Sequence, residues 1–380
     1  MKKYYLMAPG PTPIPPEVLQ ALSQPIIHHR TPEYEAIFAE VRAGLKLLYQ
    51  TKEEIIPFAA SGTGALEAAV VNTLSPGDKA IVVQAGKFGE RWTGICKAYG
   101  VQTVLLEAPY GETVPADKIA DALKKDGAIK AVFATHSETS TGVLHDIESY
   151  AQAVRKTAAI LVVDAVSSLG VADLPMDAWG VDVVVAGSQK GLMLPPGLAL
   201  VAAGPKAWEL VKTSKLPKFY FSMVAERKSV EKNQANFTPA VNIIVGLKVA
   251  LDILKREGLP NVFKRHDRLA RATRAGVEAL GLTLFSKAKP SPAITAVVAP
   301  KGIDGEKVLS AFGKSHNITI AGGQGEMQGK IFRLGHMGYV GDFDVIVAIS
   351  ALELVLTELG VPVDLGAGVR AAEKVFAESR

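Results

Sequence analysis

One lysine, Lys190, follows a run of apolar β-branched residues, and its amine is the first candidate for chemistry in this sequence. Residues 183–186 (VVVA) predict a buried strand, and Gly187 and Ser188 predict the turn that ends it. An ammonium group at the end of a buried strand loses hydration unless something uses it. Lysine amines in such sites form Schiff bases with carbonyl cofactors. The alternative is a solvated lysine on an ordinary strand-to-loop turn.

A second motif, Ser61-Gly62-Thr63-Gly64, joins a predicted strand to the start of a predicted helix. Small residues at a helix N-terminus let backbone N–H groups approach an anion, and the helix dipole adds favourable potential. The motif lacks the Gly-Lys-Ser/Thr of a P-loop and the glycine spacing of a dinucleotide site. It therefore predicts a phosphate cradle without magnesium chemistry, and an ordinary capped turn is the alternative.

A third motif, residues 160–164 (ILVVD), places Asp164 at the end of an apolar strand. A carboxylate there needs a partner, and a protonated ring nitrogen is one candidate; a structural cap is the other. Lys190 follows 190 − 164 = 26 residues later, which leaves room for a connection and the next strand. A phosphate cradle, an acid for a ring nitrogen and a Schiff-base lysine together suit pyridoxal phosphate.

Predicted strands and helices alternate through the segment that carries these motifs. The strands are 55–59, 79–84, 103–106, 131–135, 160–165, 181–186 and 198–202, and the helices between them include 64–74, 90–99, 116–124 and 147–157. Continuous Val/Ile runs in this alternation predict an α/β fold with a mostly parallel sheet covered by helices on both faces. Ligands bind outside the carboxyl ends of such strands, where all three motifs fall.

Three regions are predicted along the chain. Residues 1–16 form an extended, proline-rich arm, because prolines at alternating positions exclude a helix. Residues 17–257 form the large domain, which ends in a long helix over 238–257. Residues 258–380 form a smaller α+β domain with short strands at 293–298 and 331–334 and a closing helix near 343–359.

Composition narrows the class of protein. The chain has 380 residues, 48% hydrophobic and 21% charged, with a net charge of +4 spread along the sequence. This balance is ordinary for a globular enzyme and gives little support to nucleic-acid binding. The single cysteine, Cys96, excludes an intrachain disulfide and a cysteine-cluster metal site, and no metal is expected. No membrane-spanning stretch or secretory signal is seen, so we expect a cytoplasmic protein.

At this point the sequence resembles a known family. The motifs APGPTPIPPEV, HHRTPEYEAIF, SGTGALEAA, HSETSTGVLHDI, VVDAVSSLG, GSQKGL and FRLGHMG span nearly the whole chain. They resemble the class V aminotransferases of pyridoxal-phosphate fold type I, in particular the alanine–glyoxylate and serine–pyruvate branch. GSQK downstream of VDAVSS is highly specific for that group.

The resemblance implies roles for the residues of the three motifs. It makes Lys190 the residue that holds pyridoxal phosphate as a Schiff base and then moves the proton between the substrate Cα and the cofactor. It pairs Asp164 with the pyridinium nitrogen. It assigns the phosphate to Gly62, Thr63 and Gln189.

The resemblance also implies roles for residues outside these motifs. Thr139 would contact the ring of the cofactor, and Phe88 stands where the family usually stacks a tryptophan on it. Thr238 would reach the phosphate of the neighbouring subunit, which implies a homodimer, although Ala235 replaces the tyrosine of the animal enzymes. Arg333 would bind the substrate carboxylate, for which guanidinium geometry is suited.

The remaining candidates are histidines and one cysteine. His28, His29 and His336 either approach the cleft or pack under loops. Cys96 lies in a predicted helix and is expected to be buried filler.

The resulting hypothesis is a ping-pong transaminase that moves the amino group of alanine or serine to glyoxylate or pyruvate. A 2-aminoethylphosphonate–pyruvate transaminase, or a non-catalytic subunit that retains the fold, are the alternatives. A cysteine desulfurase is rejected, because residues 321–330 (AGGQGEMQGK) lack the nucleophilic cysteine that this activity needs.

Overall fold

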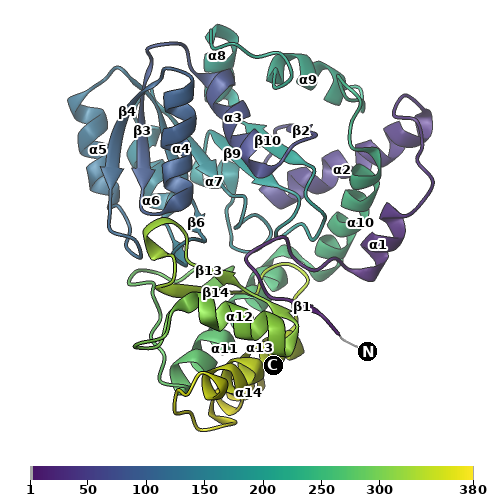
Figure 1. Ribbon diagram of the computed structural model, residues 1–380. Coiled ribbons are helices and arrows are strands. Elements are labelled where there is room, and N and C mark those ends of the chain that lie inside the picture. Colours follow the sequence, from purple (N-terminus) through teal and green to yellow (C-terminus); the bar gives the residue numbers. More distant parts are fainter. Residues whose placement is uncertain (1–2, 380) are drawn as a thin grey trace.

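A seven-stranded sheet forms the centre of the larger part of the molecule (Figure 1). The computed structural model describes residues 3–379. In spatial order the strands are β2 (Ile55–Phe58), β10 (Ala199–Ala203), β9 (Val183–Gly187), β8 (Ile160–Asp164), β5 (Ile129–Thr135), β3 (Lys79–Gln84) and β4 (Gln102–Glu107). Neighbours pair in parallel except β10, which is antiparallel to both β2 and β9. The mostly parallel sheet predicted from the sequence is confirmed.

Side chains along each central strand alternate between two buried clusters, one on each face of the sheet. In β3, Ile81 and Val83 belong to one cluster, and Ala80 and Val82 to the other. Helices α3 (Gly62–Thr73), α4 (Lys87–Ala98) and α8 (Pro205–Thr213) contribute to one cluster; α2 (Pro32–Tyr49), α5 (Ala116–Lys125), α6 (Ile147–Arg155) and α10 (Val241–Glu257) contribute to the other. The sheet is apolar on both faces because helices cover both.

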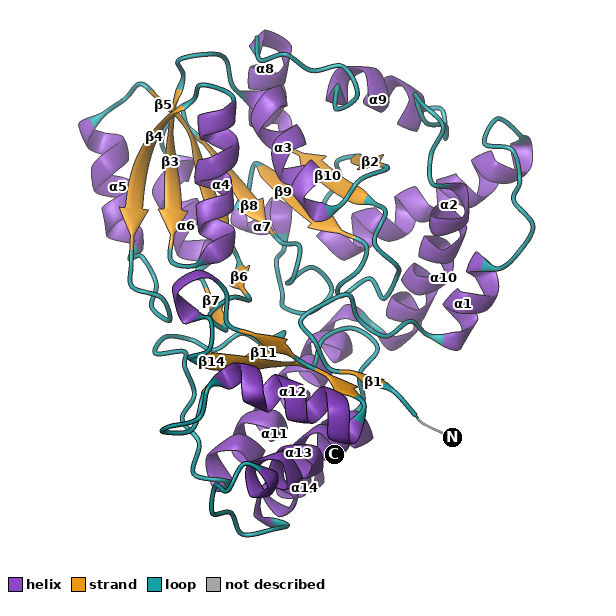
Figure 2. Cartoon of the chain, in the orientation of Figure 1, coloured by secondary structure: helices purple, strands orange, loops and turns teal. Residues whose placement is uncertain are grey.

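A second, antiparallel sheet lies beside the carboxyl-terminal helices (Figure 2). Its order is β11 (Ile294–Val298), β14 (Ile331–Gly335) and β13 (Ala321–Gly322). The helices around it are α11 (Leu259–Ala279), α12 (Gly305–His316), α13 (Asp342–Glu358) and α14 (Ala367–Glu378), and they share a separate hydrophobic core with this sheet. Sequence patterning placed the last helix near 343–359, whereas the structure has one more helix, α14, packed on α11 and α13.

The amino-terminal arm is extended, and it joins the smaller sheet region before it reaches the larger one. Strand β1 (Tyr5–Leu6) pairs in parallel with β12 (Ile318–Thr319). The backbone N–H of Gly335 then donates to the carbonyl of Met7 at 2.6 Å. Further along, the N–H of Thr12 donates to the carbonyl of Gln189 at 3.2 Å, so the arm crosses from one sheet to the other before α1 (Pro16–Leu22) begins.

Several helix starts differ from the prediction, and helix α4, expected from residue 90, begins three residues earlier, at Lys87. The long helix expected from Thr238 begins at Val241. Thr238 precedes Pro239, and a residue before a proline is disfavoured in the helical region. Helix α3 starts two residues earlier than expected, at Gly62. The short elements are β6 (Ser137–Glu138), β7 (Val143–Leu144), α7 (Met176–Trp179), α9 (Met223–Val230) and η1 (Gly325–Met327). From residue 3 to 379, each helix is too short or too polar to pass through a bilayer.

Candidate active site

The carboxyl ends of β8 and β9 bring Asp164 and Lys190 to one pocket. The two strands pair in parallel, so the residues that follow them emerge at the same edge of the sheet. The pocket holds about 520 Å³ of empty space, its open mouth included. It is lined by Ser61, Gly62, Thr63, Leu66, Phe88, Arg91, Ser137, Asp164, Val166, Ser167, Gln189 and Lys190.

The amine of Lys190 is largely buried, and the amino-terminal arm lies against it. Its Nζ donates a hydrogen bond to the carbonyl oxygen of Pro9. The pKa of Lys190 is lowered from 10.5 to about 8, mainly by burial and also by the positive charges of Arg333 and Arg91, while Asp164 opposes the fall. A much larger fraction of this amine is neutral near pH 8 than for an ordinary lysine, which makes it a usable nucleophile and base.

The carboxyl group of Asp164 is only 4% exposed. The backbone N–H of Val166 donates to its Oδ1 at 2.8 Å. The pKa of Asp164 is raised from 3.8 to about 6: burial is the main cause, the hydrogen bond from Val166 opposes it, and the charge of Glu138 adds to the rise. A protonated ring nitrogen placed against this carboxylate would remove the cost of burying a lone charge. The site therefore fits the base nitrogen of pyridoxal phosphate.

The start of α3 offers an anion cradle. The end of β9 lies close to the backbone of the first residue of α3: a Cβ added to Gly187 would lie 3.2 Å from the backbone N of Gly62. The side chain of the N-cap residue Ser61 makes no capping hydrogen bond to the first turn. The buried Oε1 of Gln189 has no hydrogen-bond partner, although its amide lines the same space. An open helix N-terminus fits a phosphate group, and the Gln189 amide would contribute through its Nε2 donor.

Helix α4 supplies an aromatic ring and a cation to the pocket wall. Phe88 lies in the first turn of α4, and Arg91 lies one turn further on the same face. The Arg91 Cζ is 4.7 Å from the centroid of the Phe88 ring. Arg91 Nη1 also donates to the Thr63 hydroxyl oxygen at 3.2 Å. Phe88 was named from the sequence and Arg91 was not, because the predicted helix began at residue 90 and did not place the two on one face.

Arg333, in β14, reaches this region from the smaller sheet. It is 5% exposed, and its Nη1 donates to the carbonyl of Thr139 at 2.8 Å while its Nε donates to that of Gly322 at 2.8 Å. These bonds leave Nη2 for a ligand. Burial lowers the pKa of Arg333 to about 10, and Glu138 opposes this effect. Thr139 is buried and meets Arg333 through its backbone, so its side chain's contact with a cofactor stays a prediction.

Glu138 is a buried carboxylate that sequence analysis missed. It accepts hydrogen bonds from the N–H groups of Phe88 and Gly89, at 3.1 Å each, and from the hydroxyl of Ser140 at 2.5 Å. Burial raises its pKa, and these bonds oppose the rise. Glu138 thereby fixes the start of α4 beside the pocket. In the sequence, this carboxylate stands in SETSTG, between small polar residues and shortly after a buried strand, a pattern that indicates a buried polar site.

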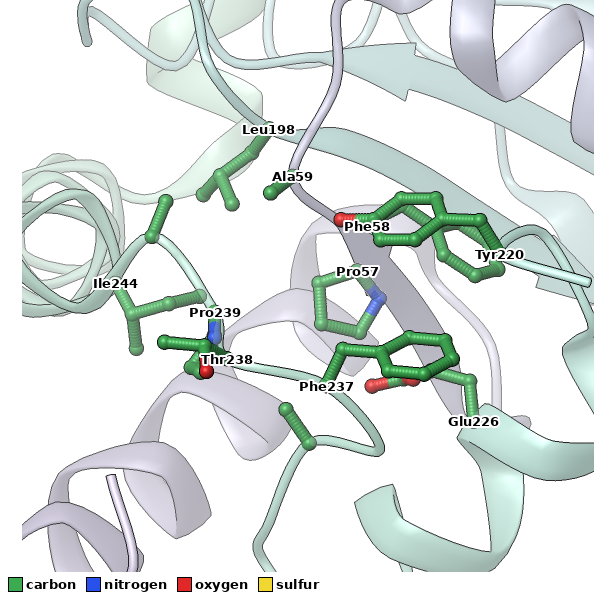
Figure 3. Close-up of a pocket in the computed structure, with 12 residues that line it drawn as sticks. Pro57, Phe58, Ala59, Leu198, Tyr220, Glu226, Phe237, Thr238, Pro239 and Ile244 are labelled. Carbon is green, nitrogen blue, oxygen red and sulfur yellow. The ribbon is translucent and has the colours of Figure 1, made fainter.

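Thr238 lies away from Lys190, in a different pocket (Figure 3). The pocket is lined by Phe58, Tyr220 and Phe237 among others, and the rings of Tyr220 and Phe237 stack with their centroids 5.4 Å apart. Thr238 is exposed, and Ala235 lines the same pocket. Within one chain the structure therefore does not bring Thr238 to the Lys190 site.

The other candidates lie outside the Lys190 pocket. His336 is buried in the smaller sheet region, where Nε2 is 3.0 Å from the Thr295 hydroxyl and Nδ1 is 2.9 Å from the Pro292 carbonyl. His28 and His29 stack on each other near the surface, with ring centroids 4.6 Å apart. Cys96 is buried in α4, and burial raises its pKa to about 12, so the expectation of a buried, unreactive thiol is confirmed.

Comparison with known proteins agrees with this geometry. The family model for class V aminotransferases matches residues 4–335. The L-aspartate–glyoxylate aminotransferase of Paracoccus denitrificans is 40% identical over 98% of this chain and 96% of its own. The small subunit of a soluble hydrogenase from Synechococcus is 48% identical over 98% of both chains.

A solved structure shows the same fold. The ureidoglycine–glyoxylate aminotransferase of Bacillus subtilis superposes with a TM-score of 0.95 at 30% identity, over 99% of both chains. The resemblance inferred from the sequence motifs, and the fold type I architecture that it implied, are therefore confirmed. The chain belongs to the class V aminotransferases, enzymes that depend on pyridoxal phosphate.

Proposed function

We propose that this aminotransferase moves the amino group of a small amino acid, alanine or serine, to glyoxylate or pyruvate by a ping-pong mechanism. The observation that carries the proposal is the pocket that Lys190 and Asp164 share, with the buried guanidinium of Arg333 close enough to lower the pKa of Lys190. An amine for the carbonyl of the cofactor, a carboxylate for its ring and a guanidinium for the substrate carboxylate are what such a reaction needs.

The residues at the strand ends would hold the cofactor. Asp164 pairs with its ring nitrogen, Phe88 stacks on the ring, and Gly62, Thr63 and Gln189 bind the phosphate. When bound, pyridoxal phosphate supplies an electron sink for the pair left at Cα when the proton departs. The chain supplies orientation and proton transfer.

Lys190 has two tasks in this scheme. At rest its amine would hold the cofactor. When the substrate amine has replaced it there, the free Lys190 amine would carry the proton between the substrate Cα and the cofactor. A pKa of about 8 gives this amine a substantial neutral fraction near physiological pH. Arg333 binds the substrate carboxylate and so fixes the direction of the Cα–H bond relative to Lys190 Nζ.

The relatives support glyoxylate as the amino acceptor. It occurs in the names of the Paracoccus and Bacillus enzymes, whose named donors differ. The donor is thus the variable part of the reaction. We retain alanine and serine as donors and include aspartate in the test, because the Paracoccus relative is named for it.

We also propose a homodimer in which Thr238 reaches the phosphate of the neighbouring subunit. Two aromatic side chains near Thr238 are exposed, Phe219 at 82% and Tyr220 at 40%. Together with Phe237 they form an apolar patch of the kind that associates with another protein surface. Light scattering of the purified protein tests the stoichiometry, and a monomer would contradict this part of the proposal.

A half-reaction screen tests the proposed substrates. The purified, cofactor-loaded enzyme is mixed with alanine, serine, aspartate and 2-aminoethylphosphonate in separate cuvettes, and bleaching of the visible cofactor band is recorded. Fast bleaching by alanine or serine, followed by recovery on addition of glyoxylate or pyruvate, is the expected result. If only 2-aminoethylphosphonate bleaches the band, the alternative transaminase is correct.

A second candidate function is a subunit of a larger assembly, which the name of the Synechococcus relative favours. A protein with that role alone would show either no visible cofactor band or a band that none of the amines bleaches. The half-reaction screen therefore distinguishes the two functions in one measurement.

A further inference from the structure

Arg91 is a second cation in the pocket of Lys190, and it has no role in the proposed transamination. Of the residues between 3 and 379, these two supply the positive side chains that line this pocket. The Arg91 guanidinium lies over the Phe88 ring and donates to the Thr63 hydroxyl. It is therefore held at the junction of two surfaces, the ring wall and the anion cradle.

The anion cradle itself lacks a full positive charge. A phosphate monoester carries about −1.5 to −2 charges near neutral pH. Against it stand the neutral residues Gly62, Thr63 and Gln189 and the N-terminus of α3, which supplies roughly half a charge. Glu138, a buried carboxylate beside the pocket, adds negative potential, whereas Asp164 is paired with the ring nitrogen in the proposed placement. A tightly held phosphate in this place needs a cation.

The tyrosine that would assist is also missing. Ala235 occupies the position where the animal enzymes have this phenol, so that donor is absent from every copy of this chain. Arg91 Nη1 already lies 3.2 Å from Thr63 Oγ1, at the first turn of α3, and its other guanidinium donors are free to turn toward an anion there.

Two arginines from different elements thus act on Lys190. Arg333 is fixed by the Thr139 and Gly322 carbonyls, on the side of the smaller sheet, and Arg91 is fixed by Thr63, on the side of α3. We propose that Arg91 is a phosphate-binding residue: its guanidinium neutralises the cofactor phosphate from within the same chain, as Arg333 neutralises the substrate carboxylate. This inference rests on the proposed placement of the cofactor at Gly62, Thr63 and Asp164.

Cofactor titration of the apoprotein tests it without any turnover measurement. The dissociation constants of pyridoxal phosphate and of pyridoxal, which has no phosphate, are compared for wild type, Arg91→Gln and Arg91→Lys. Loss of a charge-assisted hydrogen bond is expected to weaken pyridoxal phosphate by about ten- to hundredfold in Arg91→Gln and to leave pyridoxal nearly unchanged. Arg91→Lys keeps the charge and should recover part of the affinity.

A matched control removes a cation from the same helix away from the pocket. Lys97 is exposed in the last turn of α4, and Lys97→Gln should bind both ligands as wild type does. Equal weakening of both ligands by Arg91→Gln would show that Arg91 supports the fold or the ring wall instead, and no weakening would show that it does not touch the phosphate. If the wild-type protein itself binds no pyridoxal phosphate, the proposed function fails before the role of Arg91 is reached.

Discussion

The Lys190 cleft has two sides that are assembled in different ways. On the proposed cofactor side, Asp164 is the last residue of β8, Lys190 lies three residues after β9, and Gly62 begins the helix after β2. On the substrate side, Arg333 comes from the smaller antiparallel sheet, and its two hydrogen-bond acceptors come from segments 11 and 194 residues away. One side is built by local continuation of parallel strands, and the other by docking of remote segments.

This difference indicates where each property of the enzyme resides. Strand ends are fixed by the sheet, so the chemistry at the cofactor is held by the most buried part of the fold. The substrate side depends on loops and on the arm, which contact one another through single hydrogen bonds. Changes on the first side should abolish the reaction, and changes on the second should alter how substrate binds.

The largest effect is expected for Lys190→Ala. Loss of the amine removes both the attachment point of the cofactor and the proton carrier, so transamination should fall by at least about 10³-fold. Cofactor should also be lost on dialysis, and borohydride should no longer fix it to the chain. The measurements are steady-state turnover and the residual visible band, with Lys97→Ala as the control. A variant that kept wild-type turnover would remove Lys190 from the mechanism.

Arg333→Lys should separate the two sides of the cleft. It keeps the charge but loses the planar donor pair. The transition state should lose about 2–3 kcal/mol of stabilisation, which lowers kcat/KM for alanine roughly 30- to 150-fold. Retention of the cofactor should not change. Alaninamide, which lacks the carboxylate, should react equally with both proteins. If alaninamide suffers the same loss, Arg333 acts on something other than the substrate carboxylate.

The residues of the cofactor side could be predicted from the sequence more directly than those of the substrate side. Lys190, Asp164 and Gly62 were identified because each lies at or within four residues of the carboxyl end of an apolar strand, where ligands bind in a parallel sheet. Arg333 was found only through the resemblance to a family, since nothing local marks it. Glu138, Arg91 and the contact of Pro9 with Lys190 were missed, because their roles arise when segments distant in the chain meet.

Gly10→Ala tests how the arm couples the two sides. Gly10 has φ +124°, and an added Cβ would lie 2.6 Å from the Nζ of Lys190. Gly77 also has a positive φ, +82°, but has nothing within 4 Å of such a Cβ. Backbone strain alone should cost Gly77→Ala about 1 kcal/mol of unfolding free energy, whereas Gly10→Ala should cost about 2–3 kcal/mol. Urea unfolding of both apoproteins measures this.

Gly10→Ala should also slow the rebinding of cofactor to the apoprotein, because the arm or the Lys190 side chain must move aside. Gly77→Ala should rebind cofactor at the wild-type rate. Equal behaviour of the two variants in both measurements would mean that the arm does not constrain Lys190.

The smallest effect is expected for Asp164→Asn in the absence of cofactor, and it has the opposite sign. The pKa of Asp164 is raised in the folded state, from 3.8 to about 6, so the folded protein binds more protons than the unfolded chain between these values. Stability of the wild-type apoprotein therefore falls as pH rises from about 4 to about 6, because a buried carboxylate is being charged. Asparagine carries no charge and still accepts the hydrogen bond from Val166.

At about pH 7 the Asn variant should consequently be more stable than wild-type apoprotein by about 1–2 kcal/mol, and this gain should vanish near pH 4. Added pyridoxal phosphate should reverse the order, because its ring nitrogen supplies the partner that the wild-type carboxylate lacks. Chemical denaturation at the two pH values, with and without cofactor, measures all four stabilities. If the wild-type apoprotein is instead more stable than the Asn variant at neutral pH, Asp164 has another partner in the folded protein. The buried carboxylate would then not reduce the stability of the cofactor side.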